Sequence, residues 1–216
     1  MNAQSFPLQI ISSSSFFIAI FMAVLMADMI SEEYRQGTLK LILVHPVKRA
    51  QLATAKALTA GIALLVIIVF TLISSYLIGF LFFHWGDGIF VQNTPLLVHG
   101  NPLEGIRGIF CTLLASGGFM LSAFGLSMII LFLAFLSENT AVTIGIGVAL
   151  VLLSNLAMSV DFLKNYFVGT YMNSLPSMIM TGAHTSQILT GIFVSIAYVV
   201  IFYLASTIFI SRKDVL

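Results

Sequence analysis

Long apolar runs dominate the chain, and short polar segments separate them. A bilayer hydrocarbon core about 30 Å thick is crossed by roughly 20 mostly apolar helical residues. Five runs meet this requirement, at residues 10–29, 57–83, 109–136, 141–160 and 188–210. They are too long for barrel strands and lack strict alternation. The pattern therefore predicts an all-α, polytopic membrane protein with five transmembrane helices in a single domain over residues 1–216.

Two segments between the runs do not follow this pattern. Residues 84–108 are rich in glycine and proline, so we expect a structured loop there. Residues 161–187 are semi-apolar with Pro176 in the middle, and each apolar half is too short to cross a membrane. A re-entrant or interfacial helical pair and a plain amphipathic loop both fit the second segment.

Composition and charge placement refine this prediction. Only 8% of residues are charged, whereas soluble domains carry roughly 25%, which excludes a soluble domain. Basic residues concentrate on one side of the expected membrane, so the positive-inside rule predicts that residues 30–56 and the C-terminus are cytoplasmic and the N-terminus is outside. On the cytoplasmic side lie Arg35, Lys40, Lys48, Arg49, Lys56, Arg212 and Lys213, and on the outer side Arg107 and Lys164.

The segment 30–56, here named the coupling loop, has the pattern of a short helix. Gly37 interrupts the sequence and Thr38 stands where an N-cap is expected. An apolar face follows at helical spacing, and Pro46 ends the helix. That face consists of Leu39, Ile42 and Leu43. So short a helix is marginal alone in water and needs a surface to pack on.

Charged residues precede this helix. Glu32 and Glu33 are adjacent, and Arg35 lies three residues after Glu32, within reach of a helical pair. Two acids in a loop that should be positive fit a basic protein partner better than they fit lipid. Lys48 and Arg49 fit topogenic anchoring near lipid phosphates.

The ordered set Glu33, Gly37-Thr38-Leu39, Pro46, Arg49 and Lys56 resembles the pattern "E…GTL…P…R…K" of ABC-2 type exporter permeases. The C-terminal "SRKDVL" also resembles the usual ending of that family. The resemblance is strong over about residues 28–56 and diffuse elsewhere. Family members typically have six spans, and the first run here corresponds to their second. The missing span is therefore absent, lies before this sequence, or comes from a partner.

The resemblance implies a permease subunit of an ATP-driven exporter in the cell membrane of a bacterium. Its coupling loop would dock on a separate ATPase subunit, and a second permease copy or paralogue would complete a homo- or heterodimer. Glu32, Glu33 and Arg35 would make polar contacts, Thr38 would cap the coupling helix, Leu39, Ile42 and Leu43 would seat it, and Pro46 would turn the chain back. No nucleic-acid partner is implied.

Catalytic signatures are lacking in the sequence. It has no G-x-x-x-x-G-K-[ST] motif, so we expect no enzyme, no metal and no cofactor bound directly, with ATP acting through the partner subunit. Two alternatives remain open. An ion-coupled transporter would need charges in mid-span, and a non-transporting membrane scaffold would use the coupling loop to bind a partner that need not hydrolyse ATP.

Small residues mark expected helix contacts. Gly118, Ser122 and Gly125 share one face of the third run, and Gly191 and Ser195 are four apart in the fifth. Small residues at such spacing allow close approach of membrane helices. Asn155, in the fourth run, is the strongest candidate for a buried interhelical hydrogen bond.

Overall fold

Five long helices form the body of the protein in a computed structural model, which describes residues 2–35, 49–85, 89–91, 94–95, 97–98, 101–102, 105–137 and 139–212. All five are long and apolar enough to cross a membrane, which confirms the predicted number of spans. They are α1 (Phe6–Arg35), α3 (Arg49–Phe82), α4 (Gly105–Ser137), α5 (Thr140–Ala157) and α8 (Thr185–Arg212).

Most of these helices extend beyond the apolar runs that predicted them. The helix α4 has 33 residues and is therefore about 50 Å long, whereas the hydrocarbon core of a bilayer is about 30 Å thick. The added turns carry polar residues, which remain helical because backbone hydrogen bonding continues past the apolar stretch. The coupling loop is shortened in this way, since α1 runs on to Arg35 and α3 already begins at Arg49.

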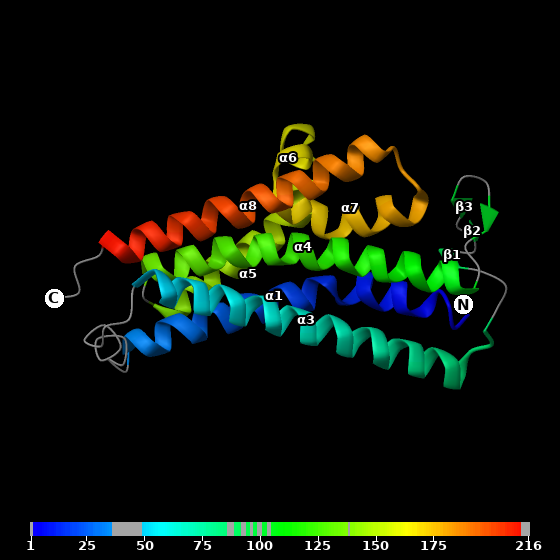
Figure 1. Cartoon of the computed structure of the whole chain (residues 1–216), viewed down its shortest axis with the longest axis horizontal. Helices are drawn as coiled ribbons and strands as arrows, with labels where there is room; N and C mark the ends of the chain where they lie inside the picture. The colour runs from blue at the N-terminus through cyan, green and yellow to red at the C-terminus, as the bar shows by residue number, and fades with distance from the viewer. Residues whose placement is uncertain are drawn as a thin grey trace.

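The helix α4 lies at the centre of the bundle and packs against α1, α3, α5 and α8 (Figure 1). Its side chains fill the core, where Phe119, Leu126, Ile130 and Phe135 are almost completely buried. The end of α1, the start of α3 and the end of α8 lie at the same end of the bundle (Figure 1). The turn from α4 into α5 lies there too, and Asn139 caps α5 by accepting a hydrogen bond from the amide of Ala141 at 2.9 Å.

The semi-apolar segment 161–187 contains two helices, α6 (Asp161–Tyr166) and α7 (Val168–Thr181). A methyl group on Gly125, near the midpoint of α4, would lie 2.9 Å from Val168 at the start of α7. The helix α7 therefore begins beside the middle part of α4. Of the two interpretations of this segment, the structure has the helical pair, with α7 packed against α4 and α8.

The break in this pair falls at Phe167, which is extended with φ −86° and ψ 124°, and Pro176 lies inside α7. Side chains from α7 bind carbonyl groups at the end of α6. The Tyr171 hydroxyl donates to the Asn165 carbonyl at 2.9 Å, and the Thr170 hydroxyl lies 2.7 Å from the Phe167 carbonyl and 2.9 Å from the Lys164 carbonyl. The break is thus held by specific hydrogen bonds, and the proline is tolerated within the helix that follows it.

Short strands precede α4 in the segment predicted as a structured loop. The strand β1 (Phe90–Val91) pairs antiparallel with β2 (Thr94–Pro95), and β3 (Leu97–Val98) pairs with β4 (Asn101–Pro102). They lie at the end of the bundle where α1 begins (Figure 1). The coupling-loop residues 36–48 lie outside the described residues.

Candidate functional site

A buried lysine joins two helices where the coupling loop leaves the bundle. Lys56 on α3 is buried, and its ammonium nitrogen donates to the backbone carbonyl of Met29 on α1 at 2.9 Å. Lys56 lies near the start of the apolar span Gln51–Phe82, where a buried ionisable side chain needs a hydrogen-bond partner. It is also the last residue of the ordered pattern in the coupling loop, so the structure connects that pattern to the packing of α1 and α3.

A second contact at this end joins α3 to α8. The hydroxyl groups of Thr54 and Tyr203 are 2.8 Å apart and form a hydrogen bond. Thr54 lies two residues before Lys56, so opposite faces of one turn of α3 are bonded to α8 and to α1. A displacement of the start of α3 would therefore be transmitted to both neighbouring helices.

The predicted contact residues of the coupling loop are only partly described. The backbone of Glu32, Glu33 and Arg35 forms the last turn of α1, and Arg49 is the first residue of α3. The remaining six predicted residues fall outside the described part of the chain, and they are Gly37, Thr38, Leu39, Ile42, Leu43 and Pro46.

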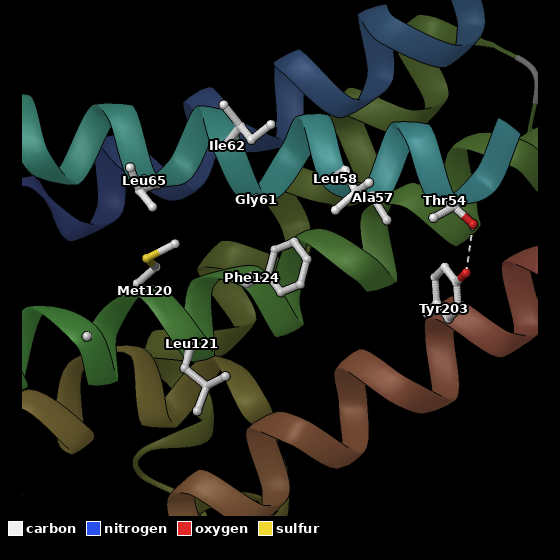
Figure 2. Close-up of a pocket in the computed structure, with 11 residues that line it drawn as sticks. Thr54, Ala57, Leu58, Gly61, Ile62, Leu65, Met120, Leu121, Phe124 and Tyr203 are labelled. Atoms are coloured by element: carbon white, nitrogen blue, oxygen red, sulfur yellow. Dashed lines mark hydrogen bonds between the residues drawn. The ribbon is translucent and has the colours of Figure 1, made fainter. Parts of the chain in front are cut away.

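A lateral groove with a volume of about 610 Å³ lies between α3, α4 and α8. Figure 2 shows the wall that α3 contributes and the Thr54–Tyr203 hydrogen bond at one end of the groove. Thr54 and Tyr203 are the polar residues of the lining. The other lining residues are apolar, and they are Ala57, Leu58, Gly61, Ile62, Leu65, Gly117, Met120, Leu121 and Phe124. The groove suits an apolar occupant.

A smaller cavity of about 140 Å³ lies between α1, α4 and α7. Ser12 and Ser15 from α1 and Asn173 and Ser177 from α7 give it a polar lining, and Phe119 places it near the midpoint of α4. One water takes up about 30 Å³ of liquid volume, so this polar cavity has room for several water molecules. Its chemistry differs from that of the lateral groove.

The small residues singled out from the sequence lie at close helix contacts. A methyl group on Gly118 would lie 2.9 Å from Ile179 of α7, and one on Gly191 would lie 2.8 Å from both Leu175 and Tyr171. A methyl group on Gly125 would also lie 3.3 Å from the Ser195 carbonyl of α8. These glycines let α4 and α8 approach α7 and each other closely.

Ser122 and Ser195 meet in the interior between α4 and α8. Both side chains are buried and their hydroxyl oxygens are 3.2 Å apart. Ser195 also donates to the Gly191 carbonyl at 2.8 Å, and Ser122 lies 3.1 Å from the Gly118 carbonyl. A hydroxyl has only one proton to donate. The proton of Ser195 belongs to its shorter bond, to the Gly191 carbonyl. The proton of Ser122 is then shared between the Gly118 carbonyl and the Ser195 hydroxyl.

The family model described as "Protein of unknown function (DUF2705)" matches residues 2–216. The chain belongs to the DUF2705 family. The match extends over all five long helices and over the coupling loop. No curated protein matches the chain.

Asn155 departs from the sequence-based expectation for this DUF2705 chain. Its side chain is exposed on α5, and its amide nitrogen lies 3.4 Å from the Val151 carbonyl of the same helix. The expected interhelical hydrogen bond at Asn155 is therefore wrong. The reason is rotational, because Ser154, the neighbouring residue, occupies the face of α5 that meets α7 at Gly169.

Other contacts were missed by sequence reasoning. A methyl group on Gly147 of α5 would lie 2.7 Å from the Ala23 methyl of α1, and the Thr54–Tyr203 pair joins residues 149 apart in sequence. The sequence contains a partial signal for the first contact, since Thr143 and Gly147 are small residues four apart in the fourth run. Within the described residues, no group of three potential metal ligands is found.

Proposed function

We propose that this chain is the membrane permease subunit of an ATP-driven exporter of the ABC-2 type. Its coupling loop docks a separate ATPase subunit, and a second permease copy or a paralogue completes the transporter. A substrate then moves from the cytoplasm or the inner leaflet to the outside, driven by ATP that the partner subunit hydrolyses.

The observation that carries the proposal is the bonding of Lys56, the last residue of the exporter-like pattern, to Met29 at the base of the coupling loop. The loop emerges between α1 and α3, which are joined by this bond at 2.9 Å. The Thr54–Tyr203 pair adds α8 to the same unit. A push on the loop by a closing ATPase dimer would move these three helices together instead of being absorbed by a flexible attachment.

The first test is co-purification from the native host in a mild detergent. The tagged wild-type chain is expected to bring down an ATPase with a phosphate-binding loop, identified by mass spectrometry. The Glu32→Lys/Glu33→Lys variant is expected to lose that partner while inserting normally. Arg212→Glu is a matched control, because it reverses a charge at the same end of the bundle outside the loop.

A second test separates an exporter from a scaffold. The reconstituted complex of permease and ATPase should hydrolyse ATP faster when its substrate is present. Partner binding without any ATPase in the co-purified material would support the scaffold alternative. Retention of the ATPase by the double-lysine variant would contradict docking through Glu32 and Glu33.

A further inference from the structure

The lateral groove has the dimensions and lining of a lipid site. It follows α3 from Thr54 to Leu65 and passes Gly117 and Phe124 of α4. We propose that it holds one acyl chain of an anionic phospholipid, drawn from the leaflet on the side of the coupling loop. This site does not require the chain to transport anything, so it goes beyond the exporter proposal.

The length of the groove matches half of a bilayer. Thr54 and Leu65 are eleven residues apart on α3, which corresponds to about 16 Å of helix rise. One leaflet contributes about half of the 30 Å hydrocarbon core. Figure 2 shows Leu65 opposite Met120, which is next to the midpoint of α4, so the groove runs from the middle of the bundle toward the coupling-loop end.

The volume of the groove is sufficient for an acyl chain. A chain of methylene groups with carbon contacts at 3.5–4.0 Å has a cross-section of about 20 Å². About 16 Å of such a chain takes up about 320 Å³, which the groove of about 610 Å³ can hold.

The opening of the groove faces the surface that lipid surrounds in a membrane. Leu58, Ile62 and Leu65 line the α3 wall and are 61%, 63% and 48% exposed. Such leucine and isoleucine side chains offer dispersion contacts and no hydrogen bonds, which is the chemistry that an acyl chain requires. A lipid can enter sideways because no described helix closes this side of the groove.

The polar end of the groove lies toward the start of α3, whose first residue is Arg49. The Thr54–Tyr203 hydroxyl pair is at that end, and α3 begins at Arg49, about 7 Å further along its axis. Basic residues at the membrane surface attract anionic head groups. With its acyl chain in the groove, the lipid would have its phosphate at the level of the first turn of α3.

Gly117 provides a way to fill the groove without disturbing the bundle. A Cβ atom added there meets no atom within 4 Å, although Gly117 lines the groove. Gly117→Phe should therefore occupy the space of the acyl chain. Gly145→Phe is the matched control, because Gly145 is also inside a helix with nothing within 4 Å of an added Cβ, and it lies on α5, away from the groove.

The experiment uses the purified full chain in nanodiscs that contain phosphatidylglycerol with a photoactivatable diazirine on its acyl chain. Peptide mapping after illumination should place most lipid adducts in residues 58–65 and 117–124. The exposed apolar face of α3 around Phe70, Ile73 and Leu77 serves as the internal reference for ordinary lipid contact. Gly117→Phe should lower the groove adducts about tenfold, since contact with several methylenes is lost, and Gly145→Phe should leave them unchanged.

Ile62→Trp fills the groove from the opposite wall and replaces Gly117→Phe if that variant does not fold. Groove adducts no more frequent than those at the reference face, or unchanged in both filled variants, would overturn the lipid site. Equal labelling by a phosphatidylcholine probe would overturn the anionic head group. A photoreactive amino acid at position 62 should yield lipid adducts, and a covalent dimer of the chain would instead assign the groove to a second copy.

Discussion

The ammonium nitrogen of Lys56 lies 2.9 Å from the backbone carbonyl oxygen of Met29, which joins the first two turns of α3 to the last two turns of α1. Burying an ammonium group is costly unless it is hydrogen-bonded. The Met29 carbonyl is a suitable acceptor, because a backbone carbonyl has a second lone pair besides the one that a helical hydrogen bond uses. The bond therefore stabilises the charged side chain and holds α1 and α3 together at the base of the coupling loop.

Replacing Lys56 by methionine should loosen this base. The substitution keeps an unbranched side chain but removes the donor, and hydrogen bonds to charged groups contribute about 1.5–3 kcal/mol, offset in part by the desolvation of the ammonium. We expect a broader distance distribution between spin labels on Asp28→Cys and Ala55→Cys, both at exposed positions of α1 and α3, in a chain with Cys111 replaced by serine.

The control for this measurement is Lys164→Met, which makes the same chemical change at an exposed lysine on α6. It should leave the α1–α3 distance distribution as in the wild type. An unchanged distribution in Lys56→Met as well would show that the bond does not hold the two helices together.

Two glycines of α4 should respond in opposite ways to the same substitution. Gly125→Ala places a methyl group 2.9 Å from Val168 and 3.3 Å from the Ser195 carbonyl, and such overpacking costs about 1–3 kcal/mol. Gly117→Ala meets nothing within 4 Å and should be neutral or stabilising by up to about 1 kcal/mol, since alanine favours helix. Unfolding in mixed micelles measures both, and equal stability of the two variants would contradict the close contact of α4 with α7 and α8.

Much of the fold was accessible from the sequence because one constraint dominates it. A lipid environment requires every spanning backbone group to be bonded within its own helix, so apolar run length alone predicts the five spans. Helix ends were less predictable. The hydrogen-bonded helix continues through polar residues, and α1 reaches Arg35 although its apolar run ends at Met29.

The contacts between helices were harder to predict. Gly118, Gly125 and Gly191 were identified because small residues at spacings of three and four share a face, and the structure places them at close contacts. Asn155 was misplaced because periodicity does not fix which face of α5 turns inward. The Thr54–Tyr203 bond and the lateral groove depend on how α3 and α8 cross, which no local pattern in either helix specifies.

The orientation of the bundle in the membrane is predicted from charge placement and can be measured directly. The positive-inside rule predicts that the end of α8 is cytoplasmic. In a chain with Cys111 replaced by serine, Ser186→Cys at the start of α8 should react with an impermeant maleimide in intact cells. Ser211→Cys, at the opposite end of the same helix, should react only after the cells are permeabilised. The reverse labelling pattern would contradict a cytoplasmic coupling loop and, with it, docking of a cytoplasmic ATPase.

The hydrogen bond between Ser122 and Ser195 should contribute little to the stability of the protein. Each hydroxyl already lies near a carbonyl of its own helix, at 3.1 Å for Ser122 and 2.8 Å for Ser195, so removing one partner leaves the other hydrogen-bonded. A double-mutant cycle of Ser122→Ala and Ser195→Ala should give a coupling energy of about 0.6 kcal/mol, as is usual for hydroxyl bonds between membrane helices. Ser122→Leu should cost more than either alanine variant, because α4 and α8 pack closely at this buried position. A coupling energy well above about 1.7 kcal/mol would mean that the proton of Ser122 belongs to Ser195 alone and that the bond to Gly118 is not formed.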